Sequence, residues 1–382
     1  MNALRQRACQ ICGNSDIRPL FDNEMAPLAG VDLSYRVGAC ATCGFNFAFE
    51  LPDDATYQCY YQNLSKYDVS ATLSASDQKR FDAIVRLCQL WLTPQSTIVD
   101  IGCGEGALLS KLKALGFQSL FGVDPAPNAP TIALDKYGLD AVRQGFFDNA
   151  ASVVPLTSAD GVCIAAVLEH LPNLRADMQI LISNMKPGSK LFIEVPTLEL
   201  FGVEYAEPFG EFSLEHINYF CRESLGQLMA SLGWRCEHTE YVEYPELQTG
   251  SVISVFARKD PPATTDFSAR PPQLDDYITG CEQQVRAVLE RIPTGDIIVY
   301  GAGSHSARVL PLLAKTTGLN VVAVVDGNPN LLGKTLGQWT IQAPGLICSL
   351  PQVPIVISSY RAQKEIAASL RGKYPNPLVL LY

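Results

Sequence analysis

One short stretch decides the fold class of this chain, and it reads Val99-Asp100-Ile101-Gly102-Cys103-Gly104-Glu105-Gly106. The apolar run at its start predicts a buried strand, and the glycines that follow predict a tight turn into a helix. Gly102 and Gly104 let the backbone pass close to a ligand, and the free amides of the helix N-terminus face that ligand. We therefore expect a cofactor to bind at this turn.

The spacing of the glycines and the flanking residues indicate which cofactor suits the turn. A dinucleotide fingerprint reads G-x-G-x-x-G, but here the third glycine, Gly106, follows directly after Glu105. A nucleoside-triphosphate loop needs G-K-[ST], which the turn lacks. Asp100 stands just before the turn, where a carboxylate disfavours a pyrophosphate and favours a cationic amino-acid ligand. Asp124 ends the next predicted strand, the position that accepts hydrogen bonds from ribose hydroxyls.

Strands and helices alternate on both sides of this turn. Short apolar and β-branched runs predict strands at Thr97–Ile101, Leu120–Val123, Asp160–Ala166, Lys190–Val195 and Val252–Phe256. Amphipathic stretches between them predict helices, for example from Ala107 to Leu115. Near-continuous apolar strands that alternate with helices predict an α/β fold, in which a mostly parallel sheet is covered on both faces.

Two changes in composition divide the chain. A long amphipathic helix pattern begins near Ser76, and a proline-rich polar linker runs from Lys259 to Asp266. Such a linker cannot continue a helix or a central strand. After the linker the alternation of strands and helices starts again. We therefore predict three units, 1–75, 76–260 and 272–382, the last of which is a second, smaller doubly wound sheet.

The composition restricts the possible partners. The chain has 29 basic and 39 acidic residues and a net charge of −10, which gives no electrostatic footprint for nucleic acid. The first residues lack the apolar core of a signal peptide, and no stretch is long and apolar enough to span a membrane. We expect a cytoplasmic protein that acts on a small molecule and binds neither nucleic acid nor a membrane.

Four of the 12 cysteines form two C-x-x-C pairs, Cys9 with Cys12 and Cys40 with Cys43. Four thiolates at this doubled spacing are typical of a closed, tetrahedral structural zinc site. A glycine follows each pair and lets backbone amides turn toward the sulfurs. A redox pair would need a C-x-x-C at a helix start after a strand, which neither pair has. We therefore predict one structural zinc ion held by these four residues.

The glycine turn resembles that of the class I S-adenosylmethionine (SAM)-dependent methyltransferases. The resemblance rests on the turn itself, on Gly122-Val123-Asp124 and on Val167-Leu168-Glu169-His170-Leu171-Pro172-Asn173. It implies a Rossmann-like sheet that binds SAM. The cofactor-binding residues that it implies are Asp100, Gly102, Cys103, Gly104, Gly106, Asp124, Phe146, Ala166 and Tyr67. Phe146 follows the third strand, where this superfamily contacts adenine; we expect its ring to pack in the hydrophobic core, and stacking on the base is the alternative.

The order of the units resembles a narrower family, the sugar C-methyltransferases, which act on nucleotide-linked keto-deoxysugars. The zinc module carries this resemblance together with two segments, Tyr60-Tyr61-Gln62-Asn63-Leu64-Ser65-Lys66-Tyr67 and Glu215-His216-Ile217-Asn218-Tyr219-Phe220. It implies that His216 is the general base and that Glu215 and His170 line the substrate pocket. It also implies that the zinc module and the aromatic segment, which contains Tyr67, close over the SAM site.

One departure from that family leaves the methyl acceptor open. The family carries a tyrosine and a further histidine just before the Glu-His pair, where this chain has Ser213 and Leu214. The substrate-contacting tyrosine is then missing, or Tyr205 or Tyr219 supplies it. Because methyl transfer to oxygen also needs a base, an O-methyltransferase of the same architecture is the alternative. His170 is the rival base, and a merely structural histidine is the alternative for His216.

The C-terminal unit contains a second glycine-rich turn, which reads Tyr300-Gly301-Ala302-Gly303-Ser304-His305, and Asp326 ends the next strand. Taken alone, this order favours a dinucleotide site, and an NAD-binding oxidoreductase is a more remote alternative. The third glycine of that fingerprint is absent. The resemblance implies instead that this unit helps to hold the nucleotide-sugar, with Gly301, Gly303, Ser304 and His305 near a phosphate or the sugar. A purely architectural domain is the other interpretation.

Overall fold

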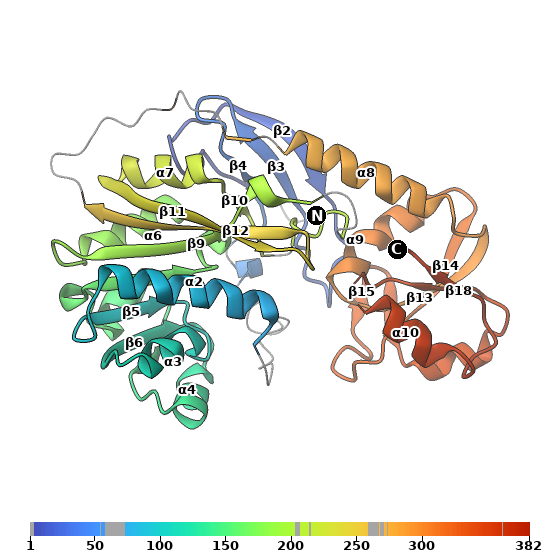
Figure 1. Ribbon diagram of the computed structural model, residues 1–382. Helices are drawn as coiled ribbons and strands as arrows, with labels where there is room; N and C mark the ends of the chain where they lie inside the picture. Colours follow the sequence, from blue (N-terminus) through green and yellow to red (C-terminus); the bar gives the residue numbers. More distant parts are fainter. Residues whose placement is uncertain are drawn as a thin grey trace.

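The computed structural model describes residues 4–53, 55–57, 73–202, 207–213, 215–258, 267, 271–272, 274–360 and 362–382. Its strands form three sheets (Figure 1): a five-stranded N-terminal sheet, a seven-stranded central sheet and a six-stranded C-terminal sheet. Within these residues, no helix is both long and apolar enough to cross a membrane.

The central sheet has the strand order β11-β12-β9-β8-β5-β6-β7. The strands from β9 to β7 run parallel, and the hairpin β11–β12 continues the sheet in the antiparallel sense. The bounds are Thr97–Ile101 (β5), Ser119–Asp124 (β6), Val142–Gln144 (β7), Gly161–Ala165 (β8), Lys190–Pro196 (β9), Trp234–Tyr244 (β11) and Thr249–Arg258 (β12). Because the parallel strands share one direction, the turns that follow them lie along the same edge of the sheet.

Helices cover both faces of this sheet, as Figure 1 shows. Successive strand residues point to opposite faces, so Ile98 belongs to the core under α2 and α3, whereas Val99 belongs to the core under α6 and α7. Both side chains are fully buried, which is why the strand reads as a continuous apolar run. The helices are Ala75–Trp91 (α2), Ala107–Ala114 (α3), Ala129–Tyr137 (α4), Ala150–Val153 (α5), Leu174–Ser183 (α6) and Arg222–Ser231 (α7).

The N-terminal sheet includes a strand from the middle of the chain. Its first strands, in the order β1-β4-β3-β2, are Arg5–Gln6 (β1), Ile17–Asn23 (β2), Tyr35–Cys40 (β3) and Asn46–Leu51 (β4). Strand β10, Asn218–Tyr219, pairs with β4 in the antiparallel sense. The amide of Ala48 also donates to the carbonyl of Ile217 at 2.8 Å. The chain therefore returns to the N-terminal sheet after it leaves β9.

The C-terminal sheet has the order β15-β16-β14-β13-β17-β18, and only β15 runs against its neighbour. Its helix α8 connects two cores, because Tyr277 and Ile278 pack with the N-terminal sheet while Val288 packs with the C-terminal one. The elements are Asp275–Leu289 (α8), Gly295–Tyr300 (β13), Ser304–Lys315 (α9), Leu319–Val325 (β14), Thr335–Leu336 (β15), Trp339–Gln342 (β16), Ile355–Ile357 (β17), Gln363–Leu370 (α10) and Leu378–Leu380 (β18).

Candidate functional site

The glycine turn joins β5 to α3 at the carboxyl edge of the central sheet. Gly102 has φ +74°, and a β-carbon there would lie 2.4 Å from Cγ2 of Val167, so no other residue fits without displacement. Gly104 also has a positive φ, +52°, but a β-carbon there would meet nothing within 4 Å. The backbone at Gly104 therefore faces open space, as a turn that cradles SAM requires.

Asp124, at the end of β6, holds this turn in place. Its Oδ2 accepts a hydrogen bond from the amide of Gly104 at 2.8 Å, and its Oδ1 accepts one from the amide of Ala126 at 2.9 Å. The side chain is buried, and this burial raises its pKa. Each carboxylate oxygen can accept a further hydrogen bond, so the geometry is compatible with bound ribose hydroxyls.

Asp100, one residue before the end of β5, is buried, and its carboxyl group makes no hydrogen bond to the described residues. Burial first, and then the nearby charge of Asp124, raises its pKa to about 8. A bound cation would reverse this effect and favour the carboxylate. Sequence reasoning did not find the basic group of this region, Arg80 on α2, which forms ion pairs with Glu194 at 3.2 Å and Asp77 at 2.8 Å.

His170 and His216 face each other at the same edge of the sheet, where His170 follows β8. Their ring centroids lie 5.0 Å apart with an interplanar angle of 69°. Nδ1 of His170 donates to the carbonyl of Glu215 at 3.1 Å, because a carbonyl can only accept. The lone pair of His170 is then on Nε2. Burial lowers the pKa of His170 to about 4 and that of His216 to about 3, so both rings are neutral at pH 7.

Glu169 lies between these histidines and the core. The side chain is 1% exposed, and neither carboxylate oxygen has a hydrogen-bond partner among the described residues. Its Oε1 lies 3.8 Å from Nε2 of His170. Burial, and then the charge of Glu194, raises the pKa of Glu169 to about 8, so this carboxyl holds a proton at neutral pH. Glu169, His170 and His216 also offer ligand atoms within 4.8 Å of one another, a spacing that can hold a metal ion.

Three further residues predicted for the SAM site are Phe146, Ala166 and Tyr67. Phe146 is 59% exposed, so the expectation that its ring packs in the hydrophobic core is wrong, and stacking on adenine stays a prediction. Ala166 ends the segment after β8 with φ +53°, a backbone conformation that non-glycine residues seldom adopt. The aromatic segment with Tyr67 lies outside the described residues, as do Tyr205 and Leu214.

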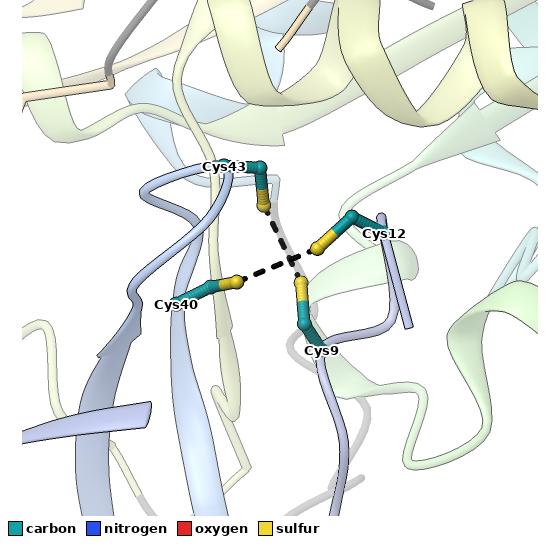
Figure 2. A group of neighbouring side chains, drawn as sticks. All are labelled: Cys9, Cys12, Cys40 and Cys43. Carbon is teal, nitrogen blue, oxygen red and sulfur yellow. Dashed lines mark hydrogen bonds between the residues drawn. The ribbon is translucent and has the colours of Figure 1, made fainter. Parts of the chain in front are cut away.

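Four sulfur atoms converge where the first residues of the chain meet the turn between β3 and β4 (Figure 2). The sulfurs of Cys9 and Cys43 lie 3.4 Å apart, as do those of Cys12 and Cys40. These separations are too long for a disulfide bond. In both turns the following glycine donates its amide to the carbonyl of the first cysteine, at 2.9 Å. The two C-x-x-C turns thus have the same local geometry, and their four sulfurs can hold a metal ion.

The C-terminal unit repeats the arrangement of the central turn. Gly301 has φ +106°, and Oδ2 of Asp326 accepts the amide of Ala302 at 2.6 Å while its Oδ1 accepts that of Asn328 at 2.7 Å. Both ring nitrogens of the buried His305 are occupied, by Ser358 at 2.9 Å and by Tyr382 at 3.0 Å. The contact of His305 with a phosphate or sugar therefore stays a prediction.

The central region matches a known family. A family model described as a methyltransferase domain matches residues 72–239, which contain the glycine turn, Asp124 and both histidines. The chain thus contains a methyltransferase domain at these residues. The match supports SAM as the cofactor of this methyltransferase domain.

The relatives of the methyltransferase domain differ in their substrates. A mitochondrial ubiquinone biosynthesis O-methyltransferase of Dictyostelium discoideum is 27% identical over 108 residues, which are 25% of this chain and 34% of that protein. A ribosomal protein L11 methyltransferase of Photobacterium profundum is 33% identical over 113 residues, 28% of this chain and 37% of that protein. This chain thus matches about a third of the length of each relative.

Among solved structures, the chain is similar to the 1,6-didemethyltoxoflavin-N1-methyltransferase of Burkholderia thailandensis. The sequence identity is 12% and the TM-score 0.42, with 64% of this chain and 100% of that chain covered. A putative methyltransferase of Listeria monocytogenes covers 47% of this chain at 14% identity and a TM-score of 0.37.

The paired aspartates give a test of where SAM binds. We predict that Asp124→Ala weakens SAM binding by about 1.5–3 kcal/mol, because it removes both the support of the turn and an acceptor for ribose. Asp326→Ala, which removes the same backbone contacts in the other unit, is the matched control and leaves SAM affinity unchanged. Calorimetric titration measures both, and a parallel titration with NAD tests the dinucleotide interpretation. Equal loss of SAM affinity in both variants, or in neither, contradicts the assignment.

Proposed function

We propose that this protein transfers a methyl group from SAM to a nucleotide-activated sugar, at a carbon beside a ketone, with His216 as the general base. The observation that carries the proposal is the pair of half-buried imidazoles, 5.0 Å apart, at the edge of the sheet that also carries the glycine turn. A neutral imidazole has a ring nitrogen whose lone pair can accept a proton. This is the requirement of a reaction that begins with removal of a proton.

The chemistry follows from these groups. His216 would take the proton from the carbon beside the ketone, which leaves an enolate whose carbon is the nucleophile. When bound, SAM supplies an electrophilic methyl group whose bond to sulfur breaks as the new carbon–carbon bond forms. The contact between His170 and the carbonyl of Glu215 orients the second ring with its lone pair on Nε2, so that His170 can act as the base in place of His216.

We assign a second part of the substrate site to the C-terminal sheet. Its strand order reverses between β13 and β17, and open α/β sheets bind ligands in the crevice at such a point. The turn with Gly301, Gly303, Ser304 and His305 follows β13 at this point of the sheet. We propose that it holds the phosphates or the sugar of the acceptor. A net charge of −10 fits a small acceptor better than a nucleic acid.

Methylation at oxygen is the second candidate. Ser213 stands where the resembling family has a substrate-contacting tyrosine, and one relative of the domain is named an O-methyltransferase. Carbon-13 NMR of a product made with [¹³C-methyl]SAM separates the two, because oxygen-bound and carbon-bound methyl carbons resonate in different regions. An oxygen-bound methyl group would assign the enzyme to the second candidate.

We also propose that Cys9, Cys12, Cys40 and Cys43 hold a structural zinc ion. Four thiolates around zinc at bond lengths of about 2.3 Å would lie about 3.8 Å apart, close to the 3.4 Å found between the paired sulfurs. The cluster contains four sulfur ligands and no carboxylate or imidazole from the described part of the chain. A site filled by four protein ligands has no position left for a substrate, so the role of this zinc is structural.

The assignment of the base is tested by two alanine variants. We predict that His216→Ala lowers kcat by about 10²–10⁴, the usual contribution of a general base. SAM affinity should not change, since no hydrogen bond among the described residues joins His216 to the glycine turn. Because burial lowers the pKa of His216 to about 3, the ring stays neutral as the pH falls from 7 to 5, and kcat/KM should not fall in that range through its protonation.

The measurement uses labelled SAM with a panel of nucleotide-linked keto-sugars, and His170→Ala is compared under saturating SAM. If His170→Ala abolishes turnover while His216→Ala retains it, the base is His170.

The zinc proposal predicts one zinc ion per chain by elemental analysis of protein purified without chelators. Cys9→Ser should lose the metal and melt at a lower temperature, because metal binding contributes to the folding free energy of this module. Cys236→Ser is the control, since that cysteine is exposed on β11, outside the cluster. Protein without zinc, or equal melting temperatures for the two variants, would rule the proposal out.

A further inference from the structure

The loop that carries His216 is held by side chains from both flanking units. On the N-terminal side, the hydroxyl of Tyr35 on β3 donates to the carbonyl of Ser213 at 2.8 Å. On the C-terminal side, the guanidinium of Arg308 on α9 donates to the carbonyl of Phe212. Neither residue belongs to the methyltransferase domain. The backbone just before His216 is therefore fixed by contacts that span more than 90 residues of sequence in either direction.

Hydrogen bonds within the loop connect Ser213 to His216. The hydroxyl oxygen of Ser213 accepts the amide of His216 at 3.0 Å and that of Glu215 at 3.3 Å, which closes a tight turn. After the histidine, the hydroxyl of Tyr219 donates to the carbonyl of His216 at 2.9 Å. The hydroxyl oxygens of Tyr35 and Tyr219 lie 3.1 Å apart. Two neighbouring phenols thus contact the backbone on both sides of the His216 side chain.

These phenols are buried, so their contacts are not exchanged for water. Tyr35 is 1% exposed and Tyr219 is 2% exposed, and both rings belong to one core cluster together with Phe212. Loss of the Tyr35 hydroxyl would leave the carbonyl of Ser213 without its donor in an apolar environment. The loop would then shift to find another donor, and His216 would move with it.

We propose that Tyr35 is a positioning residue for His216, so that the N-terminal module forms part of the catalytic apparatus. The proposal rests on the proposed function, in which His216 is the base. A displacement of a reacting group by about 1 Å can lower a rate by about 10²-fold. Tyr35 needs no contact with substrate to have this effect, because it acts through Ser213 and Tyr219.

The test compares Tyr35→Phe with Tyr277→Phe. Tyr277 is a buried phenol of the same core cluster, whose oxygen accepts the amide of Glu211 at 3.1 Å and whose ring contacts that of Phe212. It has no hydrogen bond to Ser213 or His216, the two residues through which Tyr35 would act. We expect Tyr35→Phe to lower kcat by about 10- to 100-fold with unchanged SAM affinity and zinc content. Tyr277→Phe should retain kcat. Should Tyr35→Phe fail to fold, Ser213→Ala removes the acceptor of the His216 amide and takes its place.

A second readout does not depend on turnover. The chain has four histidines, so selective ¹⁵N labelling gives few ring signals, and His216→Ala assigns one of them. Tyr35→Phe should shift or broaden the ring signals of His216, and Tyr277→Phe should leave them in place. Unmoved His216 signals in Tyr35→Phe overturn the proposal, whatever happens to kcat. If His216→Ala instead retains full turnover, the base assignment fails, while the ring signals still decide whether Tyr35 positions His216.

Discussion

The site depends on the pairing of two short segments that are far apart in sequence, β10 and β4. The amide of Ala48 donates to the carbonyl of Ile217 at 2.8 Å, and the amide of Ile217 donates to the carbonyl of Glu169 at 2.9 Å. Ile217 therefore connects the N-terminal sheet to the segment after β8. His216 is its immediate neighbour, and His170 is the neighbour of Glu169, so this one residue fixes the distance between the two imidazoles.

The side chain of Asn218 strengthens the same connection. Its amide nitrogen donates to the carbonyls of Leu168 and Leu171, at 2.9 and 2.8 Å, and its oxygen accepts from Arg7 at 3.0 Å. Arg7 and Asn218 are both buried, so their hydrogen bonds replace those to water and are costly to break. The N-terminal module thus contributes a framework for the reacting groups even though none of its described side chains is assigned a chemical step.

The sequence predicted those parts of the site that depend on local patterns. The glycine turn could be predicted because glycine favours the positive φ found at Gly102. The position of Asp124 could be predicted because it ends an apolar strand. The long-range partners could not be predicted in this way. Strand β10 has two residues, too few to show a periodic pattern. Neither β10 nor β4 contains a sequence motif that indicates their pairing. The hydrogen bond that Asp124 accepts from Gly104, and the one that Asp326 accepts from Ala302, could not be predicted either, because their donors are backbone amides, which every sequence has.

The central claim is that β10 is part of the N-terminal sheet, and native-state hydrogen exchange tests it most directly. In low denaturant, the amide of Ala48, which donates to Ile217, and the amide of Tyr219, which lies opposite Asn46 on β4, should exchange through one shared opening, with the same free energy and the same dependence on denaturant. The strands β5 to β8 should open at a free energy of their own. If Tyr219 exchanges independently of Ala48, as the amide of a separate loop would, the N-terminal sheet does not hold the segment that carries His216.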